Sequence, residues 1–302
     1  NPRQIIHLEL DAFYCAVEEQ RDPPLCGLAF AVGGRPEGRG VVSSCSYAAR
    51  KQGVRSAMSM ARAIQLCPDL RVVSPHFDLY RPASRKVMSK VRTITALVEQ
   101  ISIDEAFIDV SDLPEEAEII GRRLQAEIRD ELGLPNSLGI ATNKLVAKIA
   151  NDVGKAKSKS GAPPNALTFV SPGTEAVFLA PLPVEMLWGV GPKTAEKLAL
   201  MAVQTIGDLA TVPDHELARR FGKNGWDLAR RAKGIDKREI VTEREAKSIS
   251  QETTFEKDVR DGQILRERLI KQTQRVTKQL RKQGLSARTV KIKIRWPDFT
   301  TL

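Results

Sequence analysis

Three acidic side chains stand where acids are unusual in a folded chain. Glu9 lies within an apolar run, and Asp104 and Glu105 separate two apolar stretches. Because a buried carboxylate needs a cation or hydrogen-bond donors, the pattern indicates an oxygen-rich site of the kind that Mg²⁺ prefers. Two such ions can activate a hydroxyl and stabilise a pyrophosphate leaving group. Acid pairs are also common at hairpin turns, so the pattern alone leaves a structural role open.

A second chemical feature is the one-sided charge near the end of the sequence. The chain carries 47 Lys and Arg against 37 Asp and Glu, a net charge of +10. Residues 266–295 hold eleven basic residues and one acid, Glu267, so this stretch alone accounts for the +10. Near its end Lys291, Lys293 and Arg295 alternate with apolar residues, which predicts a strand with one cationic face. Such a face can follow nucleic-acid phosphates; the alternative is a solvated helix face.

Length and composition exclude several classes of protein. The 302 residues suffice for two or more cores, and 42% hydrophobic residues exclude a disordered tail. The four cysteines form no C-x-x-C pair and there are three histidines, which argues against a zinc site and for a reducing compartment. We find neither an apolar run of membrane-spanning length nor a signal-peptide pattern, so we expect a soluble intracellular protein.

The elements that must position the acidic residues are strands and helices in alternation. Strands are expected at 5–10, 28–32, 41–44 and 137–142, and as a tightly connected pair, 101–103 with 106–110. Helices are expected at 11–20, 46–54, 58–67, 114–132 and 143–155. The helix at 114–132 has the clearest signals, because acidic residues occupy its positive end and apolar residues recur every four positions.

The composition changes after Lys155, where the run 155–165 is typical of a loop or domain boundary. The chain beyond it is mainly helical to about Gly234, and a charged linker follows. Residues 248–255 then predict a strand, 265–283 a basic helix and 289–296 a second strand. Two strands and one helix are a thin basis for an independent core, so we expect this last unit to be incomplete.

Five segments in this order resemble the signature segments of the Y-family DNA polymerases, nearest the polymerase IV and kappa branch. They are IIHLELDAFYCAVEEQRDP, GVVSSCSYAARKQGVRSAMSM, VEQISIDEAFIDVSDL, SLGIATNKLVAKIANDVGK and LWGVGPKTAEKL. The resemblance implies an α+β fold arranged as a right hand. It implies a palm at 1–12 and 76–162, fingers at 13–75, a helical thumb with a helix-hairpin-helix at 163–234, a linker at 235–247 and a partial α/β little finger at 248–302.

The resemblance assigns the metal site to residues that the acidic pattern had already singled out. It places metal-binding carboxylates on Glu9, Asp104 and Glu105 and a backbone carbonyl ligand on Leu10, with Asp104 and Glu105 catalytic. The family usually has Asp-x-Asp where this chain has Glu9-Leu10-Asp11. Since Mg²⁺ tolerates distorted coordination poorly, we expect metal binding to survive the longer side chain, with Mn²⁺ accepted better than Mg²⁺.

The resemblance also implies a nucleotide pocket. Phe13 and Tyr14 match the aromatic pair that carries the family's steric gate, Tyr14 being the ring that would collide with a ribose 2′-hydroxyl; the alternative is an ordinary core aromatic. The other matching positions are the triphosphate-binding residues Ser44, Tyr47, Arg50 and Lys155. Residues three apart on a helix share a face, so the hydroxyl of Tyr47 and the guanidinium of Arg50 can reach one triphosphate.

The segment 187–198 resembles a helix-hairpin-helix turn. Gly189 and Gly191 permit a tight turn, and Pro192 suits the first position of a helix. The free N–H groups at that helix start can take a DNA phosphate with help from Lys193. Such turns also join helices that bind nothing, but a lysine directly after the proline in a basic chain favours DNA.

We therefore expect an error-prone, template-directed polymerase that adds dNTPs to a primer 3′ end with two Mg²⁺ ions, copies past damaged bases and does not proofread. Its expected partners are primer-template DNA, dNTPs and a sliding clamp bound through a C-terminal peptide outside this sequence. We expect a monomer in the cytoplasm, associated with the nucleoid in a bacterium. Two alternatives stay open: a catalytically weakened DNA-binding protein of the same fold, and a repair nuclease or glycosylase that uses the helix-hairpin-helix.

Overall fold

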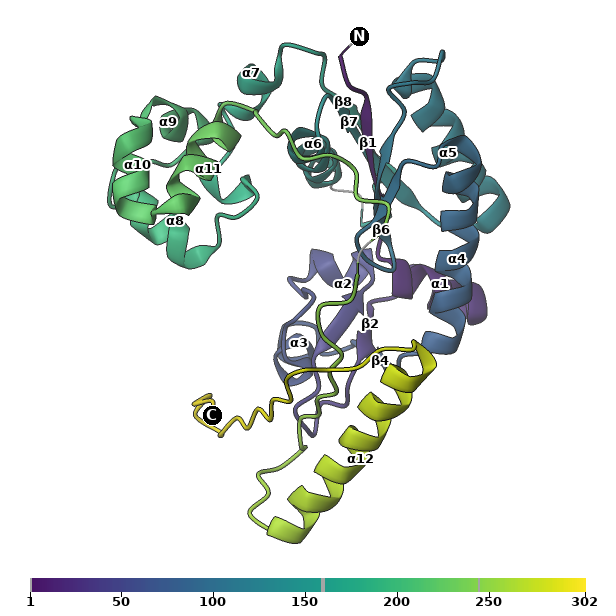
Figure 1. Ribbon diagram of the computed structural model, residues 1–302. Helices are drawn as coiled ribbons and strands as arrows, with labels where there is room; N and C mark the ends of the chain where they lie inside the picture. The colour runs from purple at the N-terminus through teal and green to yellow at the C-terminus, as the bar shows by residue number, and fades with distance from the viewer. Residues whose placement is uncertain (1, 159–160, 244) are drawn as a thin grey trace.

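A five-stranded mixed sheet is the central element. The computed structural model describes residues 2–158, 161–243 and 245–302. The strands follow the order β5-β6-β1-β7-β8 (Figure 1). Their bounds are Val98–Gln100, Glu105–Asp109, Ile5–Leu10, Asn136–Ala141 and Leu167–Phe169, in that order. β1 pairs antiparallel with both β6 and β7, which places the predicted buried strand at the centre of the sheet.

Alternation along β1 assigns its side chains to two different layers. Ile6, Leu8 and Leu10 are buried in one core cluster, whereas Ile5 is buried in another. His7 and Glu9 share the face of Ile5, because side chains two apart in a strand point the same way. The sequence thus places three aliphatic residues on one face and its two titratable ones on the other.

Helices cover the two faces of the sheet. The aliphatic face packs against α4 (Phe77–Ile94) and α5 (Ala117–Leu132), and the opposite face packs against α6 (Lys144–Lys157) (Figure 1). Gly139 on β7 lets α6 approach closely, since a β-carbon there would lie 1.9 Å from the carbonyl oxygen of Ala147. No helix was predicted at 77–94, because the interior Pro82 is a helix-breaking signal.

A second, smaller unit precedes α4. Its three strands follow the order β3-β2-β4, with β2 antiparallel to β3 and parallel to β4. These strands are Val42–Cys45, Phe30–Gly33 and Arg71–Val73, in that order. The helices around them are α1 (Phe13–Arg21), α2 (Tyr47–Lys51) and α3 (Met60–Leu66), and a 3-10 turn covers Pro23–Leu25. The predicted strands and helices of this unit are present, and β4 is an addition that the sequence did not reveal.

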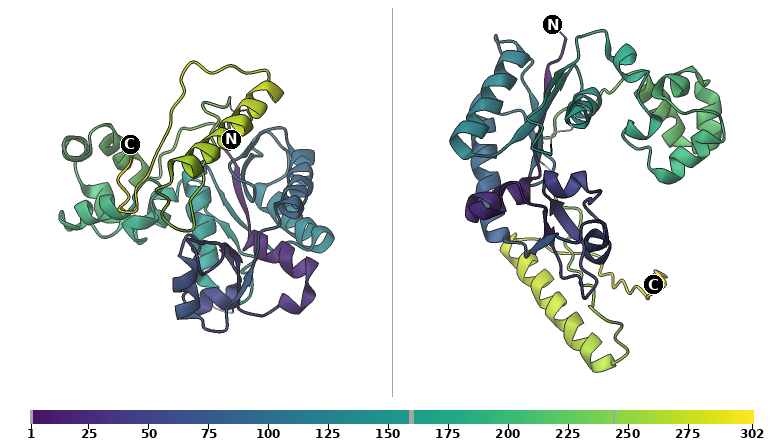
Figure 2. Two further views of the ribbon diagram at one scale, coloured as in Figure 1. Left: turned by 90° about the horizontal axis from the view of Figure 1, so that it is seen from below. Right: turned by 180° about the vertical axis from the view of Figure 1, so that it is seen from behind.

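A lobe of short helices follows β8 and lies on the α6 side of the sheet (Figure 2). Its elements are α7 (Glu175–Leu179), a 3-10 turn (Val184–Met186), α8 (Pro192–Ala199), α9 (Ile206–Thr211), α10 (Asp214–Phe221) and α11 (Lys223–Ala232). Their buried side chains form one cluster with those of α6. β8 comes from the segment that the sequence assigned to the thumb, yet it pairs with β7 and extends the sheet.

The last unit differs from the prediction. The basic helix is present as α12 (Gly262–Lys282), but the strands predicted at 248–255 and 289–296 do not form. In the second segment, the bridge between Arg295 and Thr301 is the pairing that remains. Three backbone hydrogen bonds join residues 294–296 to 300–302, so the end of this segment forms a short hairpin. A longer strand also needs a neighbour for the N–H and C=O groups of 289–293, and among the described residues no ladder reaches them.

The connection between β5 and β6 also differs from the prediction. The strand predicted at 101–103 is wrong: β5 ends at Gln100, and residues 101–104 form the tight connection to β6, where the Ile101 N–H donates to the Glu105 carbonyl oxygen over 3.0 Å. In the described residues, no helix has the length and apolar character needed to cross a bilayer.

Candidate active site

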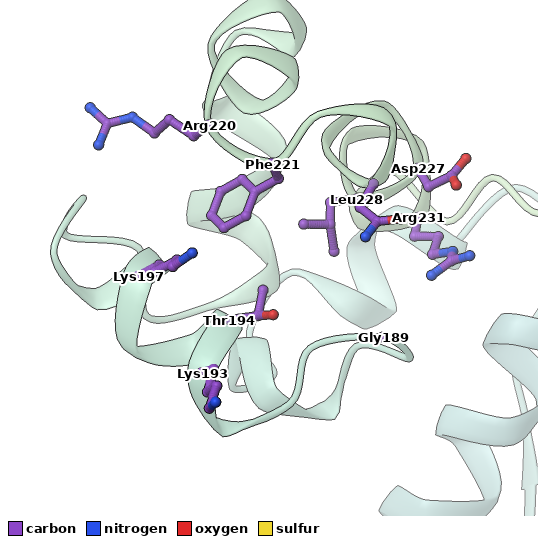
Figure 3. A pocket seen from close by; sticks show the side chains of 10 residues that line it. Gly189, Lys193, Thr194, Lys197, Arg220, Phe221, Asp227, Leu228 and Arg231 are labelled. Carbon is purple, nitrogen blue, oxygen red and sulfur yellow. The ribbon is translucent and has the colours of Figure 1, made fainter. Parts of the chain in front are cut away.

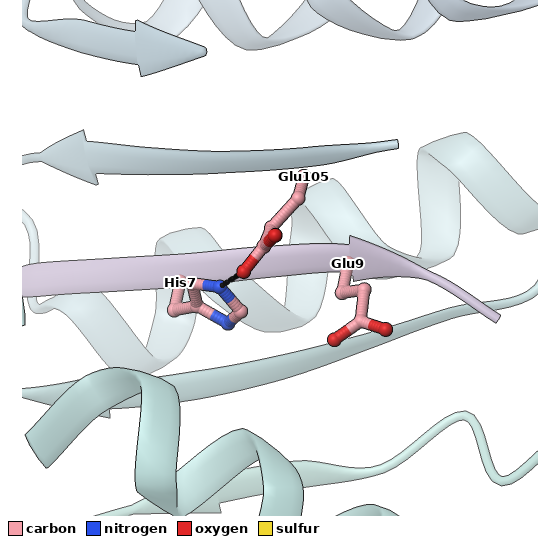
Figure 4. A group of neighbouring side chains, drawn as sticks. All are labelled: His7, Glu9 and Glu105. Carbon is pink, nitrogen blue, oxygen red and sulfur yellow. Dashed lines mark hydrogen bonds and ion pairs between the residues drawn. The ribbon is translucent and has the colours of Figure 1, made fainter. Parts of the chain in front are cut away.

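His7, Glu9 and Glu105 meet on the α6 face of the sheet. Glu9 on β1 lies directly opposite Glu105 on β6, and His7 stands two residues before Glu9. One ligand atom from each of the three lies within 4.8 Å of the other two (Figure 4). The imidazole Nε2 of His7 is 2.6 Å from Oε1 of Glu105. The antiparallel register therefore brings together two acids that are 96 positions apart in the chain.

Two lysines from α6 lie on these carboxylates. Nζ of Lys148 is 2.7 Å from Oε1 of Glu105, and Nζ of Lys155 is 2.5 Å from Oε1 of Glu9 and 3.8 Å from Asp11. Burial acts to raise the pKa of Glu105, but hydrogen bonds and charge from His7 and Lys148 outweigh it and lower that pKa to about 2. Glu105 is therefore an anion at neutral pH.

Asp104 occupies the end of the connection into β6. Its carbonyl oxygen accepts the N–H of Leu10 over 2.9 Å, which fixes the ends of β1 and β6 together. The hydroxyl of Ser102 donates to Oδ1 of Asp104 over 2.5 Å. Burial raises the pKa of this carboxyl, and the charges of Glu9 and Glu105 add to that effect. The three predicted carboxylates thus share one end of the sheet, with Asp104 outside the tight group of Figure 4.

The structure adds residues that the sequence analysis did not assign. Asp11 is buried, accepts from the Ser137 hydroxyl over 2.8 Å and from the Asn165 N–H over 3.1 Å, and has its pKa raised by burial. Asp152 on α6 has its pKa raised by burial, with Lys148 opposing the shift. The sequence contained a pattern that could have identified Lys148 and Asp152, because positions 148, 152 and 155 recur at helical spacing on one face of the predicted helix.

The donor set suits a hard divalent cation. Carboxylates from three acids at one end of the sheet, with the Leu10 backbone beside them, are oxygen ligands of the type that Mg²⁺ and Mn²⁺ take. The site already attracts cations, because an ammonium group lies on Glu9 and another on Glu105. The residues present therefore fit the metal that the sequence predicted.

Tyr14 is held in a cluster of aromatic rings beside this site. Its ring stacks on Tyr80 at 4.4 Å with an interplanar angle of 15°, and Phe77 and Phe13 lie against it at 5.8 and 5.7 Å. The Tyr80 hydroxyl donates to the buried carboxylate of Glu18 over 2.5 Å. Burial, and secondarily the charge of Asp104, raise the pKa of Tyr14. The ring is therefore fixed in place and close to the acids.

The second unit contributes a buried hydroxyl beside the carboxylates. The hydroxyl oxygen of Tyr47 makes no hydrogen bond of good geometry among the described residues, and burial together with the charge of Asp11 raises the pKa of Tyr47. The Arg50 guanidinium lies 4.8 Å from the centre of the Tyr47 ring, as the three-residue helical spacing predicted. Ser44 is buried on β3 and accepts a weak hydrogen bond from the Cys15 thiol over 3.5 Å. A buried hydroxyl without a well-formed hydrogen bond is costly, which favours a ligand here.

The helical lobe contains a cavity of about 430 Å³ beside the predicted helix-hairpin-helix. Gly189 has φ +100°, Gly191 precedes α8, and Pro192 is its first residue. The side chains that line the cavity include four cations, Lys193, Lys197, Arg220 and Arg231 (Figure 3). The glycines and the proline occupy the predicted positions in the turn. α10 and α11 contribute the two arginines that line the cavity, Arg220 and Arg231.

The basic C-terminal stretch is exposed. Lys291 and Lys293 lie outside the strands and helices, Arg295 lies in the short pairing with Thr301, and α12 buries none of its side chains. Across the described residues, none of the eleven cations at 266–295 forms an ion pair. These positive charges are consequently available to a partner.

Comparison with known proteins decides the family. The impB/mucB/samB family profile matches residues 8–152, the profile of that family's C-terminal domain matches residues 246–302, and the IMS family HHH motif matches residues 172–201. DNA polymerase IV of Alkalilimnicola ehrlichii is 40% identical over 300 residues, covering 98% of this chain and 82% of that protein. The chain belongs to the impB/mucB/samB family.

Solved structures of this family agree with the fold. The insertion ternary complex of Dbh DNA polymerase is 28% identical, with a TM-score of 0.69 over 76% of this chain and 67% of that one. A Y-family DNA polymerase chimera of Dbh and Dpo4 covers 99% of this chain and 86% of its own length with a TM-score of 0.82; at 24% identity it supports the fold alone. The predicted Y-family membership and α+β fold are confirmed.

Proposed function

We propose that this chain is a template-directed DNA polymerase of the translesion class, which extends a primer 3′ end by two-metal catalysis. The observation that carries the proposal is the meeting of Glu9, Asp104 and Glu105 at one end of the sheet, beside Lys155 of α6. The polymerase IV relatives and the Y-family fold support the same activity. The helix-hairpin-helix alone would also suit a repair nuclease, but that reading leaves the carboxylates and the Tyr47 hydroxyl unexplained.

Glu9, Asp104, Glu105 and the Leu10 carbonyl would hold the metal ions. When bound, two Mg²⁺ ions would supply the Lewis acidity that activates the primer hydroxyl and stabilises the leaving pyrophosphate. The carboxylates bring a concentrated negative charge that only cations can balance, and in the structure Lys148 and Lys155 provide that balance. A metal ion held by Glu9 would compete with Lys155 for that carboxylate, which would free the ammonium group for a triphosphate.

The nucleotide pocket would lie between the two sheets. The Tyr47 hydroxyl and the Arg50 guanidinium donate to the triphosphate, with Ser44 on the neighbouring strand and Lys155 opposite. Tyr14, held by its stack on Tyr80, occupies the space that a ribose 2′-hydroxyl needs. This arrangement selects a deoxyribonucleotide by shape and holds its phosphates by charge.

Primer-template DNA would be bound through its phosphates. The Gly189–Gly191 turn offers backbone N–H groups at the start of α8, next to Lys193. The cations at 266–295, including Lys291, Lys293 and Arg295, provide a second, sequence-independent contact. Such a surface suits an enzyme that must accept any template, damaged ones included.

The test is primer extension on an undamaged template with Mg²⁺ and Mn²⁺ in parallel, for the wild type, Asp104→Ala and Glu9→Asp. We expect extension by the wild type, its loss in Asp104→Ala by at least roughly a hundredfold, and a gain in Mg²⁺-supported rate in Glu9→Asp. Asp112→Ala is the matched control, because Asp112 is an exposed acid just beyond β6. No extension with either metal, despite binding of primer-template, would instead support the catalytically weakened DNA-binding protein.

A further inference from the structure

A buried histidine lies behind the carboxylates without a role in the proposed reaction. His7 is fully buried on β1, with Phe107 against its ring at 4.8 Å. Both ring nitrogens have partners: Nε2 is 2.6 Å from Oε1 of Glu105, and Nδ1 is 3.0 Å from Nδ2 of Asn151 on α6. The ring therefore bridges a predicted metal ligand and an amide that the sequence analysis did not assign.

The amide of Asn151 determines which ring nitrogen carries the proton. Its Nδ2 also lies 3.2 Å from the carbonyl oxygen of Ser137, which can only accept a hydrogen bond. The group that faces Ser137 and His7 must accordingly be the NH₂ of Asn151. It donates to Nδ1 of His7, so Nδ1 is unprotonated and the ring proton is on Nε2, which donates to Glu105.

Glu105 is consequently engaged through one oxygen. Its Oε1 accepts from both His7 and Lys148, and within the described residues no hydrogen bond is made by Oε2. Because the proton on Nε2 points at Glu105, the imidazole cannot ligate a cation on that side, although it belongs to the tight group with Glu9. The arrangement matches a general feature of metal sites, in which outer hydrogen bonds orient the ligating group.

We propose that Asn151 is a positioning residue that holds His7 as the Nε2–H tautomer, so that Glu105 is fixed through Oε1 and offers Oε2 to the divalent cation. The inference rests on the proposed function for its metal and adds a residue to it. The fold explains the placement, because Gly139 lies opposite His7 in the sheet. A β-carbon on Gly139 would stand 2.5 Å from the backbone nitrogen of Asn151, and its absence brings α6 close enough for the amide to reach the ring.

The first test is spectroscopic and needs neither metal nor substrate. A long-range ¹H–¹⁵N correlation spectrum of the metal-free, ¹⁵N-histidine-labelled protein reports the protonated nitrogen of each ring, and the chain has three histidines. His7→Gln identifies the signals of His7. We expect an unprotonated Nδ1 and a protonated Nε2 in the wild type; a proton on Nδ1 would overturn the proposal.

The second test replaces the hydrogen-bond donor that faces Nδ1 of His7 by an acceptor. In Asn151→Asp a carboxylate faces Nδ1, so we expect Nδ1 to acquire a proton. The ring is then either the neutral Nδ1–H tautomer or an imidazolium. In the first case Nε2 directs a lone pair at Glu105, and in the second the ring adds a positive charge beside it, so both states weaken Glu105 as a metal ligand. The Mn²⁺ dissociation constant, measured by electron paramagnetic resonance on the protein with the metal alone, should rise about tenfold, and kcat should fall by a similar factor. The dNTP KM and the Kd for primer-template should stay within about twofold.

Asn151→Leu, which removes the donor at similar volume, is the second variant if Asn151→Asp does not fold. It should show the same split between a lower kcat and an unchanged KM. Asn143→Ala is the matched control: Asn143 caps the same helix, so its loss lowers stability without reaching His7. Wild-type Mn²⁺ affinity in a folded Asn151 variant would refute the positioning role. Retained extension by Asp104→Ala would refute the proposed function alone and leave the tautomer assignment standing.

Discussion

Two charged regions of this protein are built in opposite ways. On the α6 face of the sheet, Glu9 and Glu105 each lie against a lysine at 2.5 to 2.7 Å, with the histidine buried behind them. In the stretch 266–295, the cations are exposed and none is paired within the described chain. The first region balances its charges internally; the second leaves its charge for a partner.

The two regions should respond differently to substitution. In the first, every group depends on its neighbours in a low-dielectric setting, so one substitution leaves another group buried and unpaired. In the second, each cation acts on phosphates through water and salt, so the contributions are small and nearly additive. Substitutions should therefore produce large, specific effects near β1 and small, salt-dependent effects in the C-terminal stretch.

The largest expected effect comes from Lys155→Met. It removes the cation on Glu9 and the proposed triphosphate contact, so kcat/KM for dNTP incorporation should fall roughly 10²- to 10³-fold. Single-nucleotide incorporation kinetics measure it. Lys157→Met, an exposed lysine on the same helix, should behave as the wild type. A loss of less than about threefold in Lys155→Met would place the triphosphate elsewhere.

Tyr14→Ala should break sugar selection. Removing the ring stacked on Tyr80 opens space for a 2′-hydroxyl, so the preference for dNTP over rNTP should fall on the order of a hundredfold. The measurement is the ratio of kcat/KM for the two sugars with the same base. Tyr14→Phe keeps the ring and should keep the preference; unchanged selectivity in Tyr14→Ala would remove this residue from the role.

The pH dependence of stability tests the buried carboxylate of Glu18, which accepts a hydrogen bond from Tyr80 beside Tyr14. Burial acts to raise the pKa of this carboxyl, but hydrogen bonds from Tyr80, His76 and Arg21 outweigh it and lower the pKa below its usual value. Because the folded pKa lies below the unfolded one, the stabilisation is complete above the unfolded value of about 4.3 and is lost as pH falls through the folded pKa.

Glu18→Gln should therefore lower the free energy of unfolding at pH 7 by about 1.5 kcal/mol, roughly tenfold in the equilibrium, and flatten the fall below pH 4.3. Urea unfolding across pH 3 to 7 checks this. Glu37→Gln, at an exposed acid, is the control. If the free energy of unfolding of Glu18→Gln and of the wild type depends on pH in the same way, the partners of Glu18 do not lower its pKa.

The smallest effect belongs to the C-terminal stretch. Each of Lys291→Ala, Lys293→Ala and Arg295→Ala should reduce the slope of log Kd against log salt by about 0.9, which is about threefold in affinity over a fourfold change in salt. Fluorescence anisotropy with a primer-template duplex measures it. Lys90→Ala is the control, since Lys90 is paired with Glu131 at 2.7 Å. A slope unchanged in all three variants would show that this stretch does not meet the phosphates.

Local patterns predicted most of the sheet and helices near the site. Alternation placed β1, the four-residue apolar repeat placed α5, and the glycine, proline and lysine of 189–193 placed the start of α8. The same reasoning failed for residues 289–296, where the alternation is clear but only 294–296 pair with another segment of the described chain, 300–302. It also gave no element for α4, since Pro82 is a breaker in isolation and is tolerated once the helix packs on the sheet.

Residue type and spacing alone identified which residues carry charge and which local structure they form. Glu9, Asp104, Glu105 and the basic stretch were identified by residue type and spacing, because a misplaced acid or a one-sided charge is a local property. The contacts of Glu105 with His7 and Lys148, and of Asn151 with the His7 ring, follow from the folded arrangement and not from any local pattern. Such partners lie up to 144 positions apart, and only sheet register and the close approach of α6 at Gly139 bring them within hydrogen-bond distance.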